Sequence, residues 1–428
     1  MALTLLIASL VLMIVLGAPI AIAMAVVPAV YISLTGELPL SAVPYQMFEA
    51  VSVQPLLAVP FFILTAEIMN SAQITGRLLT LARELVGRVR GGLAHMNIVG
   101  SMMFAAMNGS AVADVAAIGG VMIPAMRKEG YPGPFAAALT AMGSTMGGIL
   151  PPSILLVILA STMGISIGAV FAAGVIPGVL VGSILMAIVY VLAMRRGWGR
   201  YAAPFTFSAL LRATLGAWGA LLIPAIILGG IISGVFTATE AGAIAALTAL
   251  VLGTTVYRTL TLKTLGRALF RAVKVTSSVF IIIAASGPLS WLLNRIGALD
   301  GLQGFLLQFA HSPFTFSIVV VVFILVIGTL LEPVPCVVML GPTLIAACVQ
   351  AGFHEVQAAI LLATGFILGS VTPPVGVCYF TAAAIGGEKV DRVARAIVPF
   401  LAADILVMFL VLLVPSITLT LPRLLGLI

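Results

Sequence analysis

One stretch of the chain occurs twice, and each copy runs into a double proline. The first copy extends from Gly130 to Gly147-Gly148-Ile149-Leu150-Pro151-Pro152, and the second from Gly352 to Gly369-Ser370-Val371-Thr372-Pro373-Pro374. Shifted by 222 positions without a gap, the copies share nine of 23 residues. Proline lacks the amide hydrogen and clashes with the preceding turn, so a helix cannot continue through Pro-Pro. Paired broken membrane helices in two halves of a chain indicate the binding site of a secondary transporter.

The composition predicts an integral membrane protein. Of the 428 residues, 62% are hydrophobic and only 8% are charged, against about 25% charged in soluble proteins. The net charge of +7 does not indicate nucleic-acid binding, because the basic residues lie in short loops where they set orientation in the bilayer. The chain has no HExxH or Walker pattern, so we expect neither an enzyme nor an organic cofactor.

The internal repeat divides the chain into two halves. We expect an all-α integral membrane protein with an inverted-topology repeat, two re-entrant helical hairpins and two broken transmembrane helices. The first repeat is 1–196, with scaffold spans and an arm over 1–75, a hairpin over about 92–126, a broken helix over about 134–165 and a span over 168–194. A polar linker, 197–213, leads to the second repeat, 214–428, with scaffold spans and an arm over 214–293, a hairpin over about 314–350, a broken helix over about 356–385 and a last span over 396–421. At the start of the chain, residues 3–16 and 18–35 form either a tight helical pair or one kinked helix.

The first hairpin follows from charge and length. Arginines precede the apolar stretch 92–126 and Arg127-Lys128 follow it, which places both ends on the cytoplasmic face. Two arms of about 15 residues are too short for two complete spans of about 20 residues each. We therefore expect a segment that enters the membrane and returns, with Asn108–Asp114 near its tip; two short complete spans are the alternative.

Charge also predicts the topology. The arm over about 36–54 is acidic and the corresponding arm over about 256–275 is basic, so the same element lies on opposite membrane faces in the two halves. Five spans and one hairpin per half give an odd number of crossings, which also inverts the second half. Both arguments predict N- and C-termini on the periplasmic side.

Acidic residues in apolar segments are the first candidates for function, because an ionisable group at membrane depth is costly. They are Glu67, Asp114, Glu240, Glu332 and Asp404. Glu240 follows Thr237 by three residues before an apolar run, the pattern of a helix capping box. Asp114 and Glu332 fall at the two hairpin tips, where we favour a role in binding. Glu67 and Asp404 serve either a site or bonds between neighbouring helices.

The broken helices explain how such a site binds charge. A helix that stops at Gly147 presents carbonyls, which suit Na⁺ together with the hydroxyls of Ser110, Ser144 or Thr372; the helix that begins near Pro152 presents amides, which suit a carboxylate. No basic side chain lies inside a predicted span, so an anionic substrate would be held by amides, hydroxyls and nearby cations. The candidate substrate-binding residues are Asn108, Gly109, Ser144, Thr145, Ser153 and Pro373.

Several motifs in order resemble one family. Gly91-Gly92-Leu93-Ala94, Asn108-Gly109-Ser110-Ala111-Val112-Ala113-Asp114 and Phe236-Thr237-Ala238-Thr239-Glu240, with the two Pro-Pro motifs, resemble the large membrane subunit of TRAP (tripartite ATP-independent periplasmic) transporters, the DctM family. The likeness extends from about residue 3 to the end of the chain. Glu332-Pro333-Val334-Pro335 at the second tip is richer in proline than the family pattern.

This resemblance implies a Na⁺-driven importer of small organic acids, such as C4-dicarboxylates or sialic acid, in the bacterial inner membrane. It implies an elevator mechanism, in which the hairpins and broken helices move against the scaffold. It also implies two partners, a small four-helix membrane subunit and a periplasmic binding protein. The sodium-site positions implied by the likeness are Ser110, Asp114, Gly147, Pro152, Glu332, Gly369 and Thr372.

Two other functions remain open at this stage. A one-component Na⁺/dicarboxylate symporter of the same fold group would transport in liposomes without partners. A channel would show flux without saturation or sodium dependence, and would not need inverted broken helices.

Overall fold

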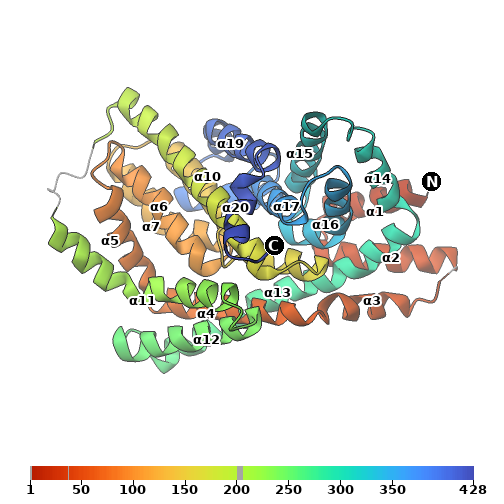
Figure 1. Cartoon of the computed structure of the whole chain (residues 1–428), viewed down its shortest axis with the longest axis horizontal. Helices are drawn as coiled ribbons and strands as arrows, with labels where there is room; N and C mark the ends of the chain where they lie inside the picture. Colours follow the sequence, from red (N-terminus) through yellow and green to blue (C-terminus); the bar gives the residue numbers. More distant parts are fainter. Residues whose placement is uncertain (1, 37, 200–205) are drawn as a thin grey trace.

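The computed structural model describes residues 2–36, 38–199 and 206–428, and throughout these residues the chain forms helices and turns without any strand (Figure 1). Within them, seven helices are long and apolar enough to cross a membrane, or eight if the bent pair Ala42–Val51 and Gln54–Ser71 is one span. The chain is therefore an all-helical, multi-pass membrane protein, which confirms the class that its composition predicts.

The first half is a chain of helices joined by short turns. In order they are α1 (Ala2–Val15), α2 (Ile20–Thr35), α3 (Ala42–Val51), α4 (Ala58–Ser71), α5 (Ile74–Val86), α6 (Gly92–Asn108), α7 (Ala111–Lys128), α8 (Gly133–Ser144), α9 (Ile154–Met163) and α10 (Ile167–Arg196). α1 and α2 pack against each other as separate helices. α6 and α7 likewise pack together across a turn at residues 108–110, which we call tip 1.

The second half contains a comparable series. Its helices are α11 (Phe207–Ile232), α12 (Ala238–Val251), α13 (Leu262–Arg295), α14 (Ala298–Leu307), α15 (Pro313–Leu330), α16 (Pro333–Gln350), α17 (Glu355–Gly369), α18 (Val377–Gly386), α19 (Val390–Leu413) and α20 (Ser416–Leu424). Residues 331–332, which join α15 to α16, are tip 2. α15 and α16 both pack against α17.

Two interruptions coincide with the proline pairs. α8 ends at Ser144, a 3-10 turn follows over Thr145–Gly148, and α9 begins at Ile154. α17 ends at Gly369 and α18 begins at Val377. The peptide bonds Pro151-Pro152 and Pro373-Pro374 are both cis. We call residues 145–153 break 1 and residues 370–376 break 2.

Long helices form a layer along one side of the molecule, at the lower edge of Figure 1. α13 packs against α2, α3 and α4, and α4 packs against α12. α13 runs antiparallel to α3 and α4: Arg271 Nε lies 3.2 Å from Glu67 Oε2, and Gly287 faces Gln46 so closely that a β-carbon at Gly287 would lie 2.5 Å from the Gln46 carbonyl oxygen. This layer forms a wall beside the tips and breaks.

The structure corrects three expected boundaries. α13 is one continuous helix of 34 residues, where the charges predicted an arm over 256–275 and a separate span. α11 begins at Phe207, so the polar linker is shorter than 197–213; its residues 200–205 lie outside the described residues. The expected last span, 396–421, is divided near Pro415 into α19 and α20, because a proline there cannot continue the hydrogen bonds of α19.

The capping box at the start of α12 is confirmed. The Thr237 hydroxyl accepts a hydrogen bond from the Glu240 amide at 3.3 Å, and Glu240 Oε2 accepts one from the Thr237 amide at 2.8 Å. Glu240 is therefore a structural residue that satisfies the free amides of a helix end.

Candidate functional site

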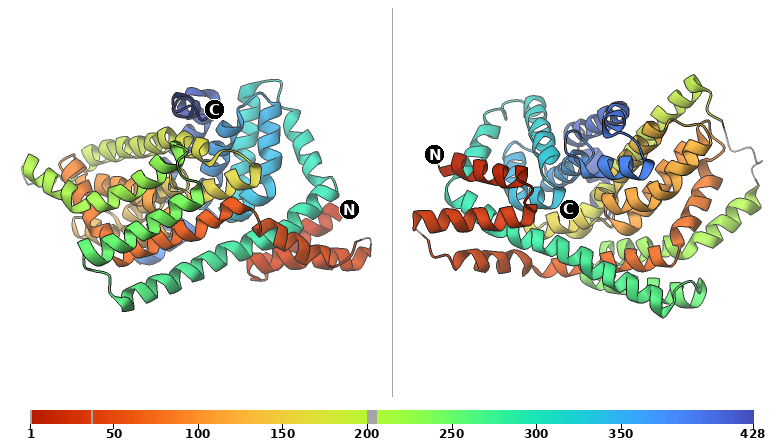
Figure 2. Two further views of the ribbon diagram at one scale, coloured as in Figure 1. Left: turned by 60° about the horizontal axis from the view of Figure 1, so that its bottom comes forward. Right: turned by 180° about the vertical axis from the view of Figure 1, so that it is seen from behind.

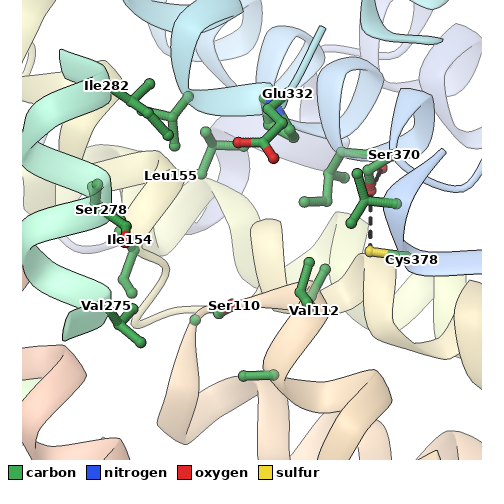
Figure 3. A pocket seen from close by; sticks show the side chains of 18 of the residues that line it. Ser110, Val112, Ile154, Leu155, Val275, Ser278, Ile282, Glu332, Ser370 and Cys378 are labelled. Atoms are coloured by element: carbon green, nitrogen blue, oxygen red, sulfur yellow. Dashed lines mark hydrogen bonds between the residues drawn. The ribbon is translucent and has the colours of Figure 1, made fainter. Parts of the chain in front are cut away.

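A cavity of about 800 Å³ lies where the two tips, break 2 and α13 meet. In Figure 3, Ser110 and Val112 lie at its floor, Glu332 reaches in from above, and Val275, Ser278 and Ile282 of α13 form its left wall. Apolar side chains dominate the lining, and a few polar groups converge on the space. This combination is typical of binding sites for small molecules.

Tip 1 is pressed against break 1 through residues that lack side chains. Gly109 adopts a left-handed conformation with φ +62°, which glycine accepts without steric cost. A β-carbon on Gly109 would lie 2.7 Å from the Pro152 carbonyl oxygen and 2.8 Å from the Ile154 amide nitrogen. One on Gly147 would lie 3.3 Å from the Ala111 amide nitrogen. The backbone of tip 1 is therefore in direct contact with both sides of break 1.

A similar backbone contact joins α15, just before tip 2, to the end of α17. A β-carbon on Gly369 would lie 2.3 Å from both the carbonyl carbon and the carbonyl oxygen of Gly328. The two helices can approach this closely only because both residues are glycine. Each predicted break thus touches one helix pair through the glycine that precedes its proline pair.

The two breaks differ in their exposure. Every residue of break 1 is buried. In break 2, Thr372 and Pro373 are half-buried, and Pro374 and Val375 are exposed. Ser370 and Gly376 of break 2 line the cavity, together with Cys378, which lies 3.4 Å from the Ser370 hydroxyl (Figure 3). In this conformation, therefore, the cavity opens onto break 2 and not onto break 1.

Asp114 has the most unusual environment of the predicted residues. It lies in the first turn of α7 with 0% of its surface exposed, and neither carboxyl oxygen has a hydrogen-bond partner. The hydroxyl of Ser101 on α6 approaches the carboxyl group, and this buried hydroxyl also has no hydrogen-bond partner. A buried carboxylate is very unfavourable without a compensating charge. The oxygens of Asp114 and Ser101 therefore fit a small cation.

The other hydroxyls predicted for the site bond to nearby backbone. The Ser144 hydroxyl donates to the Ala141 carbonyl at 2.6 Å, and the Thr372 hydroxyl donates to the Leu368 carbonyl at 2.7 Å. Their lone pairs remain available as acceptors for a cation.

Ser153 has a different task. Its hydroxyl donates to the Gly148 carbonyl at 2.9 Å and accepts from the Leu156 amide at 3.3 Å. It therefore caps α9 and fixes the fold of break 1, and its side chain is fully buried.

Thr145 links break 1 to α19. Its hydroxyl lies 2.7 Å from the Met142 carbonyl oxygen and 3.2 Å from Asp404 Oδ2. Asp404 is buried, and its other carboxyl oxygen has no hydrogen-bond partner. This contact joins Asp404 of α19 to break 1.

The cavity brings together only part of the predicted set. Asn108, Gly109, Ser110 and Glu332 line it. The remaining predicted residues are absent from its lining: Asp114, Ser144, Thr145, Gly147, Pro152, Ser153, Gly369, Thr372 and Pro373. Asp114 and Glu332 both interact electrostatically with the sulfur of Cys378, and Asp114 follows Ala113, which lines the cavity.

Several lining residues were not predicted. Ser370 and Cys378 line the cavity because the cavity opens onto break 2, and Lys274 and Ser278 line it from α13. Lys274 is the one basic side chain in the cavity lining of the described residues, where the sequence predicted no basic group inside a span. A tertiary contact of α13 with the tips places it there, and no local motif signals such a contact.

Comparison with known proteins supports an identity for this arrangement. Residues 7–417 match the family described as "Tripartite ATP-independent periplasmic transporter, DctM component". The chain belongs to this family. Among its relatives in the DctM family are the sialic acid TRAP transporter large permease protein SiaM of Vibrio cholerae, 34% identical over 95% of each chain, and the C4-dicarboxylate TRAP transporter large permease protein DctM of Pseudomonas aeruginosa, 33% identical over 89% of each chain.

A solved structure with a related fold is the YdaH transporter of Alcanivorax borkumensis. It superimposes with a TM-score of 0.57 over 86% of each chain at 14% identity, a likeness that concerns the fold alone. Membership of the DctM family together with the apolar helices makes the chain a TRAP transporter subunit and a multi-pass protein of the inner membrane.

Proposed function

We propose that the chain is the large membrane subunit of a sodium-driven importer of small organic acids. It works with a small four-helix membrane subunit and with a periplasmic binding protein that delivers the substrate. The observation that carries the proposal is the buried Asp114 carboxyl, whose oxygens have no partner, beside a cavity lined by both tips. Sodium is the coupling ion, and the substrate is a carboxylate such as those named for the relatives, sialic acid or a C4-dicarboxylate.

The same proposal assigns the ion and substrate positions. Asp114 and Ser110 with Gly147 and Pro152 form one sodium site, and Glu332, Gly369 and Thr372 belong to the second. Asn108, Gly109 and Ser110 face the substrate in the cavity. Ser144, Thr145, Ser153 and Pro373 hold the backbone that surrounds the substrate in its conformation.

Uptake should require sodium and rise with its concentration in a cooperative manner, because each half supplies a separate ion site. The measurement is uptake of labelled organic acid by proteoliposomes that contain the three components, with sodium varied against choline. We expect a Hill coefficient above one. Full uptake in choline, or a Hill coefficient of one, would contradict two cooperating sodium sites. Full uptake by this chain alone would favour a one-component symporter.

We further propose an elevator movement with an inverted repeat and periplasmic termini. The two helix pairs α6–α7 and α15–α16 form re-entrant hairpins, and they move with the broken helices against the layer of long helices. The breaks end helices at about half membrane depth: α9 and α18 have ten residues each, about 15 Å, which is half of the roughly 30 Å hydrocarbon core.

A cysteine pair across the sliding surface should test this movement. Ser290 of α13 and Val338 of α16 line one small pocket, so a short bis-maleimide, which forms a thioether with each thiol, should bridge Ser290→Cys and Val338→Cys after Cys336, Cys348 and Cys378 are replaced. We expect the bridge to stop transport and to leave sodium-induced thermal stabilisation intact. Transport that continues at the full rate with the bridge in place would contradict the elevator. Each single cysteine treated with the same reagent is the control.

A further inference from the structure

A basic stripe on α13 leads to the cavity. Lys263, Arg267, Arg271 and Lys274 are spaced by four, four and three residues, so they lie along one face of the helix. All four are exposed. The stripe begins in the first turn of α13 and ends at Lys274, which lines the cavity together with Ser278 one turn later.

Arg271 is already paired within this stripe. Its Nε lies 3.2 Å from Glu67 Oε2, and its Nη2 donates to the Ser71 hydroxyl at 3.0 Å. Both partners belong to α4, so Arg271 joins α13 to α4 and its charge is balanced there. Lys274 lines the cavity and forms no ion pair within 4.0 Å among the described residues.

The other charged groups at the cavity are acidic. Glu67 and Glu332 line it, and Asp114 follows Ala113, which also lines it. Glu67 is paired with Arg271, so the carboxylates that repel an organic anion are those of Glu332 and Asp114, and sodium at Asp114 offsets one of them. An anion that enters therefore needs a further positive charge, and among the described lining residues only Lys274 carries one. An ammonium group that meets a carboxylate in an apolar cavity forms a charge-assisted hydrogen bond, stronger than a neutral one.

We propose that Lys274 is the counter-charge for the carboxylate of the substrate, bound at the α13 wall of the cavity. The inference rests on the proposed function, since it names the residue that receives the organic anion. Lys274 determines specificity: it favours anionic substrates over neutral compounds of the same size.

The test compares Lys274→Gln, Lys274→Arg and the control Lys263→Gln, which removes a charge from the same helix face about 16 Å away at 1.5 Å per residue. The proteins are reconstituted with both partners. Labelled lactate, succinate and sialic acid are first tested with the wild-type protein. The uptake of an acid that it transports is then measured for each variant against the concentrations of substrate and sodium. Lys274→Gln should raise KM about ten- to a hundredfold, with the maximal rate and the sodium dependence unchanged. Lys274→Arg and Lys263→Gln should stay close to wild type.

The outcomes separate the two proposals. If the wild-type protein shows sodium-dependent uptake and Lys274→Gln keeps its KM, the role of Lys274 is overturned and the proposed function stands. A loss of maximal rate shared by Lys274→Gln and Lys263→Gln, with Lys274→Arg unaffected, would indicate contact of the whole stripe with lipid headgroups, and would also overturn it. If the wild-type protein takes up none of these acids, the proposed function itself is contradicted. A purified-protein thermal shift with the same acids provides an independent readout, in which Lys274→Gln should lose the shift caused by the acid and keep that caused by sodium.

Discussion

Replacing Asp114 by asparagine should weaken the response of the protein to sodium without unfolding it. The carboxyl group is fully buried and neither oxygen has a hydrogen-bond partner, so removing its charge relieves a desolvation cost when no cation is bound. We expect the sodium-free variant to be at least as heat-stable as the wild-type protein. A lost ligand should cost on the order of 1–3 kcal/mol of binding, and the sodium concentration for half-maximal uptake should rise about ten- to a hundredfold.

The measurement is thermal unfolding in detergent across a series of sodium concentrations, because a ligand that binds only the folded state stabilises it by an amount that rises with the ratio of its concentration to Kd. Asp391→Asn is a matched control, since Asp391 also lies in the first turn of a helix but is exposed and pairs with Arg395 at 3.2 Å. Asp391→Asn should keep the sodium response. An Asp114→Asn protein that expresses poorly, unfolds early and responds to sodium at the same concentrations as the wild-type protein would show that the residue is structural.

Replacing Gly369 by alanine should have the largest effect on stability and transport among the glycine substitutions around the breaks. The added β-carbon would lie 2.3 Å from the Gly328 backbone, and no side chain at Gly328 can yield. The helices α15 and α17 must then separate, and overpacking of this kind typically costs about 1–3 kcal/mol. Because this contact lies next to break 2, we also expect uptake to fall steeply.

A graded series tests the contact. Gly147→Ala meets the Ala111 amide nitrogen at 3.3 Å and should be milder, while Gly120→Ala, which has nothing within 4 Å, should be silent. Thermal unfolding and uptake should rank the three variants in this order. A Gly369→Ala protein that unfolds at the wild-type temperature and transports normally would refute the close packing of α15 and α17.

Local chemistry made part of the fold predictable. The double prolines at 151–152 and 373–374 stop a helix by their own structure, and the capping box at Thr237 and Glu240 is set within four residues. The all-helical membrane class follows from composition alone. Such features depend on neighbours along the chain, and the sequence displays them directly.

Features that depend on distant contacts were not predictable in the same way. The charges of α13 suggested an arm that ends near residue 275. Charged residues indicate which part of a helix lies outside the hydrocarbon core, but they do not indicate where the helix ends. No proline interrupts α13 before Pro288. Pro415, in contrast, is a local signal for the end of α19. The expected span 396–421 extended through this proline because its length matched that of a transmembrane helix. The place of Lys274 in the cavity arises only when α13 packs beside the tips. The sequence therefore predicted the part of the candidate site that the two tips form, and it did not predict the part that α13 forms.

The length of α13 also links this protein to the thickness of its membrane. Thirty-four residues extend about 51 Å, well beyond a hydrocarbon core of about 30 Å. The residues after Lys274 account for about 32 Å of this length, so the surplus is the basic segment at the N-terminal end (Figure 2). The basic and the apolar parts of α13 belong to one unbroken helix. A thinner or thicker bilayer that changes the tilt of the apolar part therefore changes the position of the basic part as well. A change in lipid composition that alters the bilayer thickness therefore moves the cavity wall that α13 forms, close to Lys274.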